Sequence, residues 1–240
     1  MSSAPFIDYS GRRPLRTVLI DLGRIGAGFH AIEIQRHPGF QLVGAADPLT
    51  ERCAEAKRDW GVPVYQTVDE LLDAVRPEVA VIASPTAFHC DQARAAFSRG
   101  AHVLCDKPVA RSAAEFDTVL TAAALADRSF LAYQPHRVRP ELYALKSLLR
   151  QGHLGPIHLI KRAQCNYARR NDWQAFRANS GGLLNNYASH FLDQAMALLG
   201  NDPITSVFCR TRCVATVGDA EDFVKIVLTA RSGCLVDLDI

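Results

Sequence analysis

The feature that most constrains the fold is the alternation, through the first half of the chain, of short apolar runs with longer amphipathic stretches. The runs are rich in β-branched residues, which favours strands, and the stretches between them have helical spacing. Because parallel neighbours need a crossover connection, strands separated by helices predict βαβ units and a parallel sheet. The runs are apolar almost throughout, which indicates a sheet covered on both faces. The predicted strands are 17–22, 41–47, 64–66, 78–84, 102–106 and 129–134, and the predicted helices are 26–37, 49–60, 69–75, 89–100 and 113–127.

The pattern changes near residue 135. Three of the later apolar runs are separated by short gaps, and short links join antiparallel strands. This half is therefore predicted to be an α+β domain with a mostly antiparallel open sheet. Its last strand reaches the final residue and leaves an edge to be covered, so we expect the domain to be truncated or to use a partner subunit. The predicted strands are 157–168, 206–217, 223–230 and 233–240, and the predicted helices are 140–151 and 181–200.

Charge and hydropathy limit the class of partner. The chain has 27 Lys and Arg against 25 Asp and Glu, a formal net charge of +2, and no basic block. This argues against nucleic acid and against an anionic membrane surface as partners. No apolar run approaches the roughly 20 residues of a membrane span. Residues 1–14 lack the hydrophobic stretch of a secretory signal and are predicted to be a disordered leader.

The cysteines favour a reducing compartment. Their odd number and scattered positions argue against a disulfide framework. The closest pair, Cys209 and Cys213, falls in a predicted strand and has no matching Cys or His pair, so we expect no metal site. Buried, reduced thiols of a cytoplasmic protein are the prediction. The seven residues are Cys53, Cys90, Cys105, Cys165, Cys209, Cys213 and Cys234.

A glycine-containing turn follows the first predicted strand. A dinucleotide-binding turn has the pattern G-x-G-x-x-G, in which the second glycine admits the pyrophosphate and the third lets the helix pack on the strand. Gly23 and Gly26 fill these two positions, and Asp21 replaces the first glycine with a carboxylate that would repel a pyrophosphate. A shifted register over 26–31 also fits the pattern, but it places the turn inside the helix. The expected phosphate contacts come from Gly23, Arg24, Ile25 and Gly26.

Asp47 ends the second predicted strand, at the interval from the turn where dinucleotide-binding folds place an acidic residue. A carboxylate there accepts hydrogen bonds from the ribose hydroxyls and repels a 2′-phosphate, which favours NAD over NADP. The alternative is that Asp47, which precedes Pro48, serves only as a turn or capping residue.

Four further segments, in the same order along the chain, resemble the Gfo/Idh/MocA oxidoreductases. They are Ser84–His89, Cys105–Pro108, Tyr133–Arg137 and Gly181–Asp193. The resemblance covers residues 15–240. It implies an NAD(P)-binding Rossmann domain over 15–135, with a doubly wound parallel sheet. It also implies a C-terminal domain over 136–240 that binds substrate and makes a homo-oligomer through its open sheet.

The resemblance implies a cofactor site along the carboxyl ends of the strands. Asp106-Lys107-Pro108 stands where the family has Glu-Lys-Pro, and Lys107 is expected to stabilise the developing alkoxide and to relay a proton. Aspartate shortens the anchor that glutamate provides but keeps its charge. The alternatives are a surface lysine and, for His89, a helix residue without a chemical role. Further cofactor contacts are expected from Ser84, Pro85, Thr86, His89, Asp106 and Gln134.

The helix over 181–200 resembles the family's Gly-Gly-x-Leu-x-Asp-x-Gly-x-His-x-x-Asp segment. His190 is expected to accept the proton of the substrate hydroxyl, because imidazole titrates near neutral pH. Asn186, one helical turn earlier on the same face, replaces an aspartate and can orient the hydroxyl without accepting a proton. A packed core histidine is the alternative for His190. Substrate contacts are expected from Arg137, Trp173, Arg177 and Asp193.

Two classes of function follow. The first is an NAD-dependent dehydrogenase or reductase of a sugar, cyclitol or related small molecule, in which Lys107, His190 and Asn186 act on the hydroxyl. The second is a non-catalytic relative that binds a nucleotide or sugar, or an inactive truncated member. Asp21, Asp106 and Asn186 depart from the family pattern and motivate this second class. A cofactor-assisted glycosidase is a third, weaker alternative.

Overall fold

The structure, a computed structural model, describes residues 11–240, and their contacts divide the chain into two units, Met1–Ala132 and Tyr133–Ile240. Most of the predicted leader lies outside the described residues, and the first strand begins at Leu15. No helix within residues 11–240 is long and apolar enough to span a bilayer.

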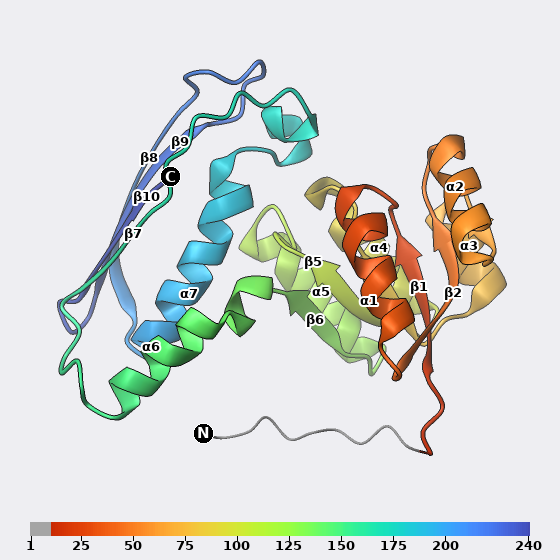
Figure 1. Cartoon of the computed structure of the whole chain (residues 1–240), viewed down its shortest axis with the longest axis horizontal. Coiled ribbons are helices and arrows are strands. Elements are labelled where there is room, and N and C mark those ends of the chain that lie inside the picture. The colour runs from red at the N-terminus through yellow and green to blue at the C-terminus, as the bar shows by residue number, and fades with distance from the viewer. Residues whose placement is uncertain (1–10) are drawn as a thin grey trace. The chain divides into compact units, whose positions relative to one another are not determined.

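Six strands form the sheet of the first unit, in the order β3-β2-β1-β4-β5-β6. Figure 1 labels β1, β2, β5 and β6 of this sheet. The pairs β1–β2, β1–β4, β2–β3 and β4–β5 are parallel, as the alternation of strands and helices predicted. This order is that of a doubly wound dinucleotide-binding sheet. The strands are β1 (Leu15–Ile20), β2 (Phe40–Ala46), β3 (Val64–Tyr65), β4 (Val79–Ile82), β5 (His102–Asp106) and β6 (Phe130–Tyr133).

Helices cover both faces of this sheet. Successive residues of β1 belong to different cores, with Val18 and Ile20 in one cluster and Leu19 in the other. All four residues of β4 are buried, which explains why the strands are apolar throughout. The helices are a π-helical segment (Gly26–His30) that continues into α1 (Ala31–Arg36), then α2 (Thr50–Trp60), α3 (Val68–Val75), α4 (Thr86–Ser98) and α5 (Ala113–Leu125).

The second unit has a four-stranded sheet in the order β7-β10-β9-β8. The pairs β8–β9 and β9–β10 are antiparallel, and β10–β7 is parallel, so the sheet is mostly antiparallel, as predicted. The strands are β7 (Leu159–Ala163), β8 (Ile204–Arg212), β9 (Phe223–Ala230) and β10 (Leu235–Asp239). The helices are α6 (Pro140–Arg150) and α7 (Ser189–Leu199), which continues a π-helical segment (Leu184–Ala188), with 3-10 turns at Pro135–Val138, Trp173–Ala175 and Arg177–Asn179.

One face of this sheet packs against α7. Alternate residues of β9 and β10, among them Leu228 and Leu238, are buried with Phe191 and Ala195 of the helix. β8 lies at the edge and is largely exposed, with Val207 at 68% and Phe208 at 54% of full accessibility. One face of the two central strands is therefore shielded from solvent, whereas the edge strand β8 is largely open to it.

Several predicted boundaries were wrong. The strand predicted over 157–168 ends at Ala163, because its partner β10 ends at Asp239 and a single further bond joins Gln164 N–H to the Asp239 carbonyl. The strand predicted over 206–217 ends at Arg212, which pairs with the first residue of β9.

The prediction that the thiols are buried holds only in part. Cys165 and Cys213 are exposed because they lie in loops beyond β7 and β8, and Cys209 is exposed on the edge strand. The four remaining cysteines are buried or half-buried, namely Cys53, Cys90, Cys105 and Cys234.

Candidate functional site

The phosphate turn of the first unit keeps its shape with an aspartate at the first position. Asp21 has a φ of +72°, a left-handed conformation that aspartate tolerates better than most residues. Its Oδ1 accepts a hydrogen bond of 2.9 Å from Gly23 N–H, a local turn that offsets the strain. A Cβ on Gly26 would lie 2.0 Å from the Asp21 carbonyl oxygen, so no other residue fits there without a shift of the backbone.

The Asp21 carboxylate thus accepts one of the N–H groups that a dinucleotide-binding turn offers to a pyrophosphate. Burial raises the pKa of this carboxyl, and the neighbouring Asp47 carboxylate adds to the rise, against the Gly23 N–H and the Arg52 guanidinium. Arg52 Nη1 lies 3.7 Å from Asp21 Oδ1. The turn therefore keeps glycines at its two later positions, and its own Asp21 carboxylate accepts the Gly23 N–H. Arg24 and Ile25 are exposed at its tip.

Asp47 follows β2 and is 1% exposed. Its Oδ2 accepts from Leu22 N–H at 2.8 Å and from Arg52 Nη1 at 3.1 Å, and its Oδ1 accepts from Leu49 N–H at 2.8 Å. Arg52, in α2, keeps 40% of its side chain exposed above this carboxylate. A ribose therefore reaches the Asp47 oxygens only if the Arg52 guanidinium moves aside.

The segment Asp106-Lys107-Pro108 follows β5. Asp106 Oδ1 lies 2.9 Å from Nε2 of His30, which is buried in the π-helical segment after the phosphate turn. The shorter carboxylate that replaces the family's glutamate therefore still has an anchor. Lys107 is half-buried, and the peptide bond to Pro108 is cis.

The turn after β4 is tied to the same segment. Ser84 Oγ donates a 2.6 Å hydrogen bond to Gln92 Oε1, and Thr86 is buried as the first residue of α4. Pro85 precedes that helix as its cap residue. His89, expected at the start of the helix, is its fourth residue and is 1% exposed. Its Nε2 lies 2.6 Å from the Ser84 carbonyl oxygen, and its Nδ1 lies 2.9 Å from the Pro108 carbonyl oxygen.

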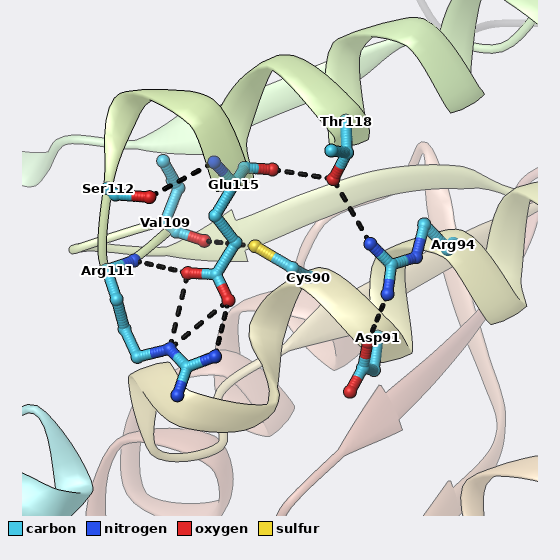
Figure 2. A network of polar contacts seen from close by, with 8 residues as sticks. All are labelled: Cys90, Asp91, Arg94, Val109, Arg111, Ser112, Glu115 and Thr118. Carbon is cyan, nitrogen blue, oxygen red and sulfur yellow. Dashed lines mark hydrogen bonds and ion pairs between the residues drawn. The ribbon is translucent and has the colours of Figure 1, made fainter.

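Beyond Pro108 the chain is fixed to α4 and α5 by the network drawn in Figure 2. Cys90 Sγ donates to the Val109 carbonyl oxygen at 3.6 Å, and Ser112 caps α5 by accepting the Glu115 N–H. Glu115 accepts from both the backbone and the guanidinium of Arg111, which lowers the pKa of its carboxyl. Both ends of the Lys107 segment are therefore held by side chains of other elements.

In the second unit His190 of α7 is 7% exposed, and its ring stacks on that of His136, with centroids 3.8 Å apart and planes inclined by 20°. Gln194, one turn later in α7, donates to the His136 carbonyl oxygen at 2.9 Å and accepts from Arg162. The Arg162 guanidinium also lies 3.8 Å from the centre of the Phe191 ring, and burial lowers its pKa. The imidazole of His190 is therefore packed against His136, whose carbonyl oxygen is in turn bonded by Gln194.

The other predicted residues of the second unit contact one another or other segments of the same unit. Arg137 and Asp193 form a bidentate pair, with Arg137 Nε 2.9 Å from each Asp193 oxygen. Asn186 Nδ2 donates to Gln174 Oε1 at 3.1 Å. Trp173 is 40% exposed in a 3-10 turn, and the Arg177 backbone N–H donates to Asp219 Oδ1 at 2.9 Å while its side chain is exposed.

A pocket of about 450 Å³ lies in the second unit, beside the start of the π-helical segment. Tyr167, Gln174, Tyr187 and Glu221 contribute to its lining, and Gln174 connects it to Asn186. Gln134, after β6, has a buried Oε1 with no hydrogen-bond partner among the described residues, so this atom can accept a bond from a ligand. Within residues 11–240, no group of three or more His, Cys, Asp or Glu side chains is arranged to hold a metal ion.

The sequence prediction missed several residues that shape these sites. His30, Arg52 and His136 each contact a predicted site residue, and Gln194 contacts His136. His30 and Arg52 lie in helices, and the residues they contact lie at the ends of neighbouring strands. These contacts depend on the tertiary packing, so they could be found only from the structure. The predicted residues of the first unit converge on the carboxyl ends of β1, β2, β4 and β5.

Comparison with known proteins gives two family matches. Residues 15–133 match the oxidoreductase family with the NAD-binding Rossmann fold named GFO/IDH/MocA, and residues 142–240 match the C-terminal domain of the same family. Inositol 2-dehydrogenase of Streptomyces avermitilis is 33% identical over 92% of this chain and 66% of its own length. The scyllo-inositol 2-dehydrogenase (NADP(+)) of Bacillus subtilis is 24% identical over 79% of this chain and 54% of its own length.

Among solved structures, the WlbA dehydrogenase from Bordetella pertussis in complex with NADH and UDP-GlcNAcA superposes with a TM-score of 0.87 and 25% identity. The match covers 95% of this chain and 72% of the other. The chain therefore spans between about half and two thirds of the length of the two curated relatives it matches here.

Proposed function

Because the chain belongs to the Gfo/Idh/MocA oxidoreductase family, we propose that it is an NAD-dependent oxidoreductase acting on a hydroxyl-bearing carbon of a sugar, cyclitol or related small molecule. The observation that carries this proposal is the arrangement of the first unit. The glycine turn, Asp47, the Ser84 turn and Lys107 follow four neighbouring parallel strands, at the edge of the sheet where such folds bind dinucleotides. We assign cofactor binding to residues 15–135 and substrate binding to residues 136–240.

The residues present fit a nicotinamide dinucleotide. Gly26 lets the helix approach the end of β1, because a Cβ there would lie 2.0 Å from the Asp21 carbonyl oxygen. Gly23 adds no side chain to the turn, and the buried Gln134 Oε1 can accept a hydrogen bond from the nicotinamide amide. When bound, the cofactor supplies the hydride transfer, and the chain supplies position and charge. Further contacts are assigned to Arg24, Ile25, Ser84, Pro85, Thr86 and Asp106, whereas His89, expected from the sequence to be another, is 1% exposed with both ring nitrogens facing carbonyl oxygens and is assigned to support this site from behind.

NAD is proposed over NADP on the basis of Asp47. A buried carboxylate at the end of β2 repels a 2′-phosphate and accepts from a ribose hydroxyl. Arg52 is the residue that could reverse this preference, because an arginine near the ribose can hold a 2′-phosphate. Removing its guanidinium by Arg52→Gln should leave NADH binding intact. An Arg52→Gln variant that loses affinity for NADPH alone would show that Arg52, and not Asp47, sets the specificity.

We assign the proton chemistry to Lys107 and His190. Lys107 places a cation beside a developing alkoxide, and the imidazole of His190, held by its stack on His136, accepts the hydroxyl proton. Asn186, fixed by Gln174, orients the hydroxyl. Arg137, Trp173, Arg177 and Asp193 are assigned to substrate binding. Because Arg137 and Asp193 form an ion pair with each other, a substrate would meet them together as one polar unit.

The test compares turnover with cofactor binding. The wild-type chain is assayed for NADH formation with NAD and a panel of inositols and hexoses, and Lys107→Ala and His190→Ala are assayed in parallel. Each should lose turnover by about 10²-fold or more, while NADH affinity falls far less. Lys146→Ala, on α6, is the matched control. Full turnover in Lys107→Ala would remove the role assigned to that residue.

The second candidate function is a non-catalytic binding protein, favoured by the Asp21 carboxylate that accepts the Gly23 N–H. Such a protein would bind a dinucleotide or sugar without turnover on any member of the panel. Cofactor binding alone does not separate the two candidates, and turnover does.

We also propose that the chain makes a homo-oligomer through its second sheet, in the cytoplasm. The face away from α7 exposes Leu159, Phe208, Phe223 and Leu235 around a central cluster of Lys and Asp side chains. Phe208→Asp should reduce the mass measured by light scattering to that of one chain. A wild-type monomer would contradict this proposal.

A further inference from the structure

We propose that His30 and His89 are positioning residues that hold Lys107 through its two neighbours along the chain. Each histidine comes from a different helix of the first unit, and each contacts a residue adjacent to Lys107. This inference rests on the role proposed above for Lys107, and it adds two residues that act on that role without touching substrate.

His30 holds the residue before Lys107. Its Nε2 lies 2.9 Å from Asp106 Oδ1, and the side chains are only 6% and 15% exposed. Because an ionised carboxylate can only accept, the ring nitrogen in this contact carries the proton. His30 lies in the segment that begins at Gly26, so the contact joins the phosphate turn to the Lys107 segment.

His89 holds the residue after Lys107. Its Nδ1 faces the Pro108 carbonyl oxygen at 2.9 Å, and its Nε2 faces the Ser84 carbonyl oxygen at 2.6 Å. The ring therefore bridges the turn after β4 and the turn after β5. A neutral imidazole has one N–H, so both contacts are hydrogen bonds only when the ring carries two protons.

The groups around His89 have opposite effects on its pKa, and hence on whether the ring carries the second proton. Burial lowers the pKa of His89, and the two carbonyl oxygens and the carboxylates of Asp106 and Asp21 oppose this fall. A neutral ring keeps one of the two contacts as a hydrogen bond. The Pro108 contact is the one that bears on Lys107.

The two histidines, together with the contact between Cys90 and Val109, restrain three of the residues around Lys107 by side chains from outside the segment. A displacement of a catalytic group by about 1 Å can lower the reaction rate about 10²-fold. Restraints on the residues next to Lys107 therefore affect the chemistry, although these restraining side chains do not touch the substrate. The backbone from which the Lys107 side chain extends is thereby restrained just beyond the end of β5.

The first test observes Lys107 directly, without turnover. The chain has five lysines, so reductive methylation with ¹³C-formaldehyde gives five lysine resonances besides that of the N-terminal amine, and Lys107→Arg identifies the one from Lys107. The side-chain amide nitrogen of asparagine can take the place of histidine Nδ1 as a hydrogen-bond donor, and that of glutamine can take the place of Nε2. His89→Asn keeps the donor toward Pro108, and His89→Gln keeps only the donor toward Ser84.

His30→Ala and His89→Gln should move the Lys107 titration midpoint by about 0.5 unit or more and should abolish the change that NADH causes in this resonance. His30→Gln and His89→Asn should retain the wild-type values. His102→Asn, at the opposite end of β5, is the control. Wild-type Lys107 signals in both His30→Ala and His89→Gln would overturn the inference.

If His89→Gln does not fold, Asp106→Asn tests the same arrangement through the other contact, because an amide weakens the pair with His30 and keeps its shape. It should move the Lys107 resonance as His30→Ala does, and an unchanged resonance would count against the inference.

The second test uses NAD with myo-inositol, if the wild type turns it over. His30→Ala and His89→Gln should lower kcat by about 10- to 100-fold with a much smaller change in the Kd for NADH. A wild type that binds neither NADH nor NADPH refutes the proposed function. The Lys107 titration still decides the inference in that case, so the two failures are distinguishable.

Discussion

The two sheets of this protein bury their strands differently, and this difference explains why the apolar residues follow a different pattern in each half of the sequence. In the first unit β1 contributes residues to cores on both faces, and all of β4 is buried. In the second unit β9 and β10 bury alternate residues against α7 and leave the others half-buried or exposed. Continuous apolar runs therefore belong to a doubly covered sheet, and alternating ones to a sheet with one open face.

The candidate sites differ in the same way. In the first unit Asp47, His89 and Asp106 each bond to a group of another segment, and Asp21 bonds within its own turn. In the second unit Arg137 and Asp193 pair with each other near the surface. Contacts between segments therefore hold these residues of the first unit, whereas the Arg137–Asp193 pair of the second unit has an exposed arginine.

The largest expected effect is a difference in the free energy of unfolding when the same substitution, Val→Ala, is made in each of the two sheets. Val81→Ala in β4 removes a buried side chain and should lower the free energy of unfolding by about 2–3 kcal/mol. Val227→Ala, on the open face of β9, should cost less than about 1 kcal/mol. Hydrogen exchange of the strand amides reports each unit by itself. Equal losses would contradict the assignment of a covered and an open sheet.

The next effect concerns the phosphate turn. Asp21→Gly frees the Gly23 N–H and removes a like charge, so the affinity for NADH should rise about tenfold. Glycine also suits the left-handed φ at this position. Asp21→Asn keeps an acceptor without the charge and should give an intermediate affinity. NADH fluorescence titration measures both, and a weaker Asp21→Gly variant would mean that Asp21 assists binding.

A smaller effect is expected in the second unit. Asp193→Asn breaks a pair whose Arg137 side chain is 62% exposed, so unfolding should be easier by about 1 kcal/mol or less. The loss should shrink further in high salt, because exposed charges are screened. Urea unfolding at low and high salt measures it. A loss comparable to that of Val81→Ala would show that this pair is a buried anchor like those of the first unit.

The smallest effect depends on pH. Two hydrogen bonds from Arg13 and one from the Arg16 N–H lower the pKa of Glu78 from 4.5 to about 2. A carboxyl with a depressed pKa stabilises the folded state above its unfolded pKa, and this contribution is lost as pH falls toward 2. Glu78→Gln should therefore lower Tm by a few degrees at pH 7 and by nothing near pH 2. An equal difference in Tm between the wild type and Glu78→Gln at both pH values would show that the ionised Glu78 carboxylate is not the cause.

The sequence predicted the elements of the first unit well because its periodicity and its packing agree. The boundaries failed where pairing decides them, as at Ala163 and Arg212, since a strand ends where its partner ends. The exposed Cys209 could not be foreseen, because the run around it resembles a buried strand and only its edge position leaves it in solvent.

The motifs indicated where the candidate site lies but not what holds it. Lys107 and Asp47 could be located from their places after predicted strands. The partners His30 and Arg52 come from helices whose rotation depends on packing, and no local pattern indicates that they face these carboxylates. Asp21 was an unexplained departure in the sequence, and its bond to Gly23 shows how the turn accommodates it.

The central claim is that the first unit binds a nicotinamide dinucleotide through its phosphate turn and Asp47. Titration of the purified chain with NADH and with NADPH, followed by nicotinamide fluorescence, tests it most directly. The account predicts saturable binding of NADH and much weaker binding of NADPH. Binding of neither nucleotide would contradict it, and would give the Asp21 carboxylate the role of blocking the turn.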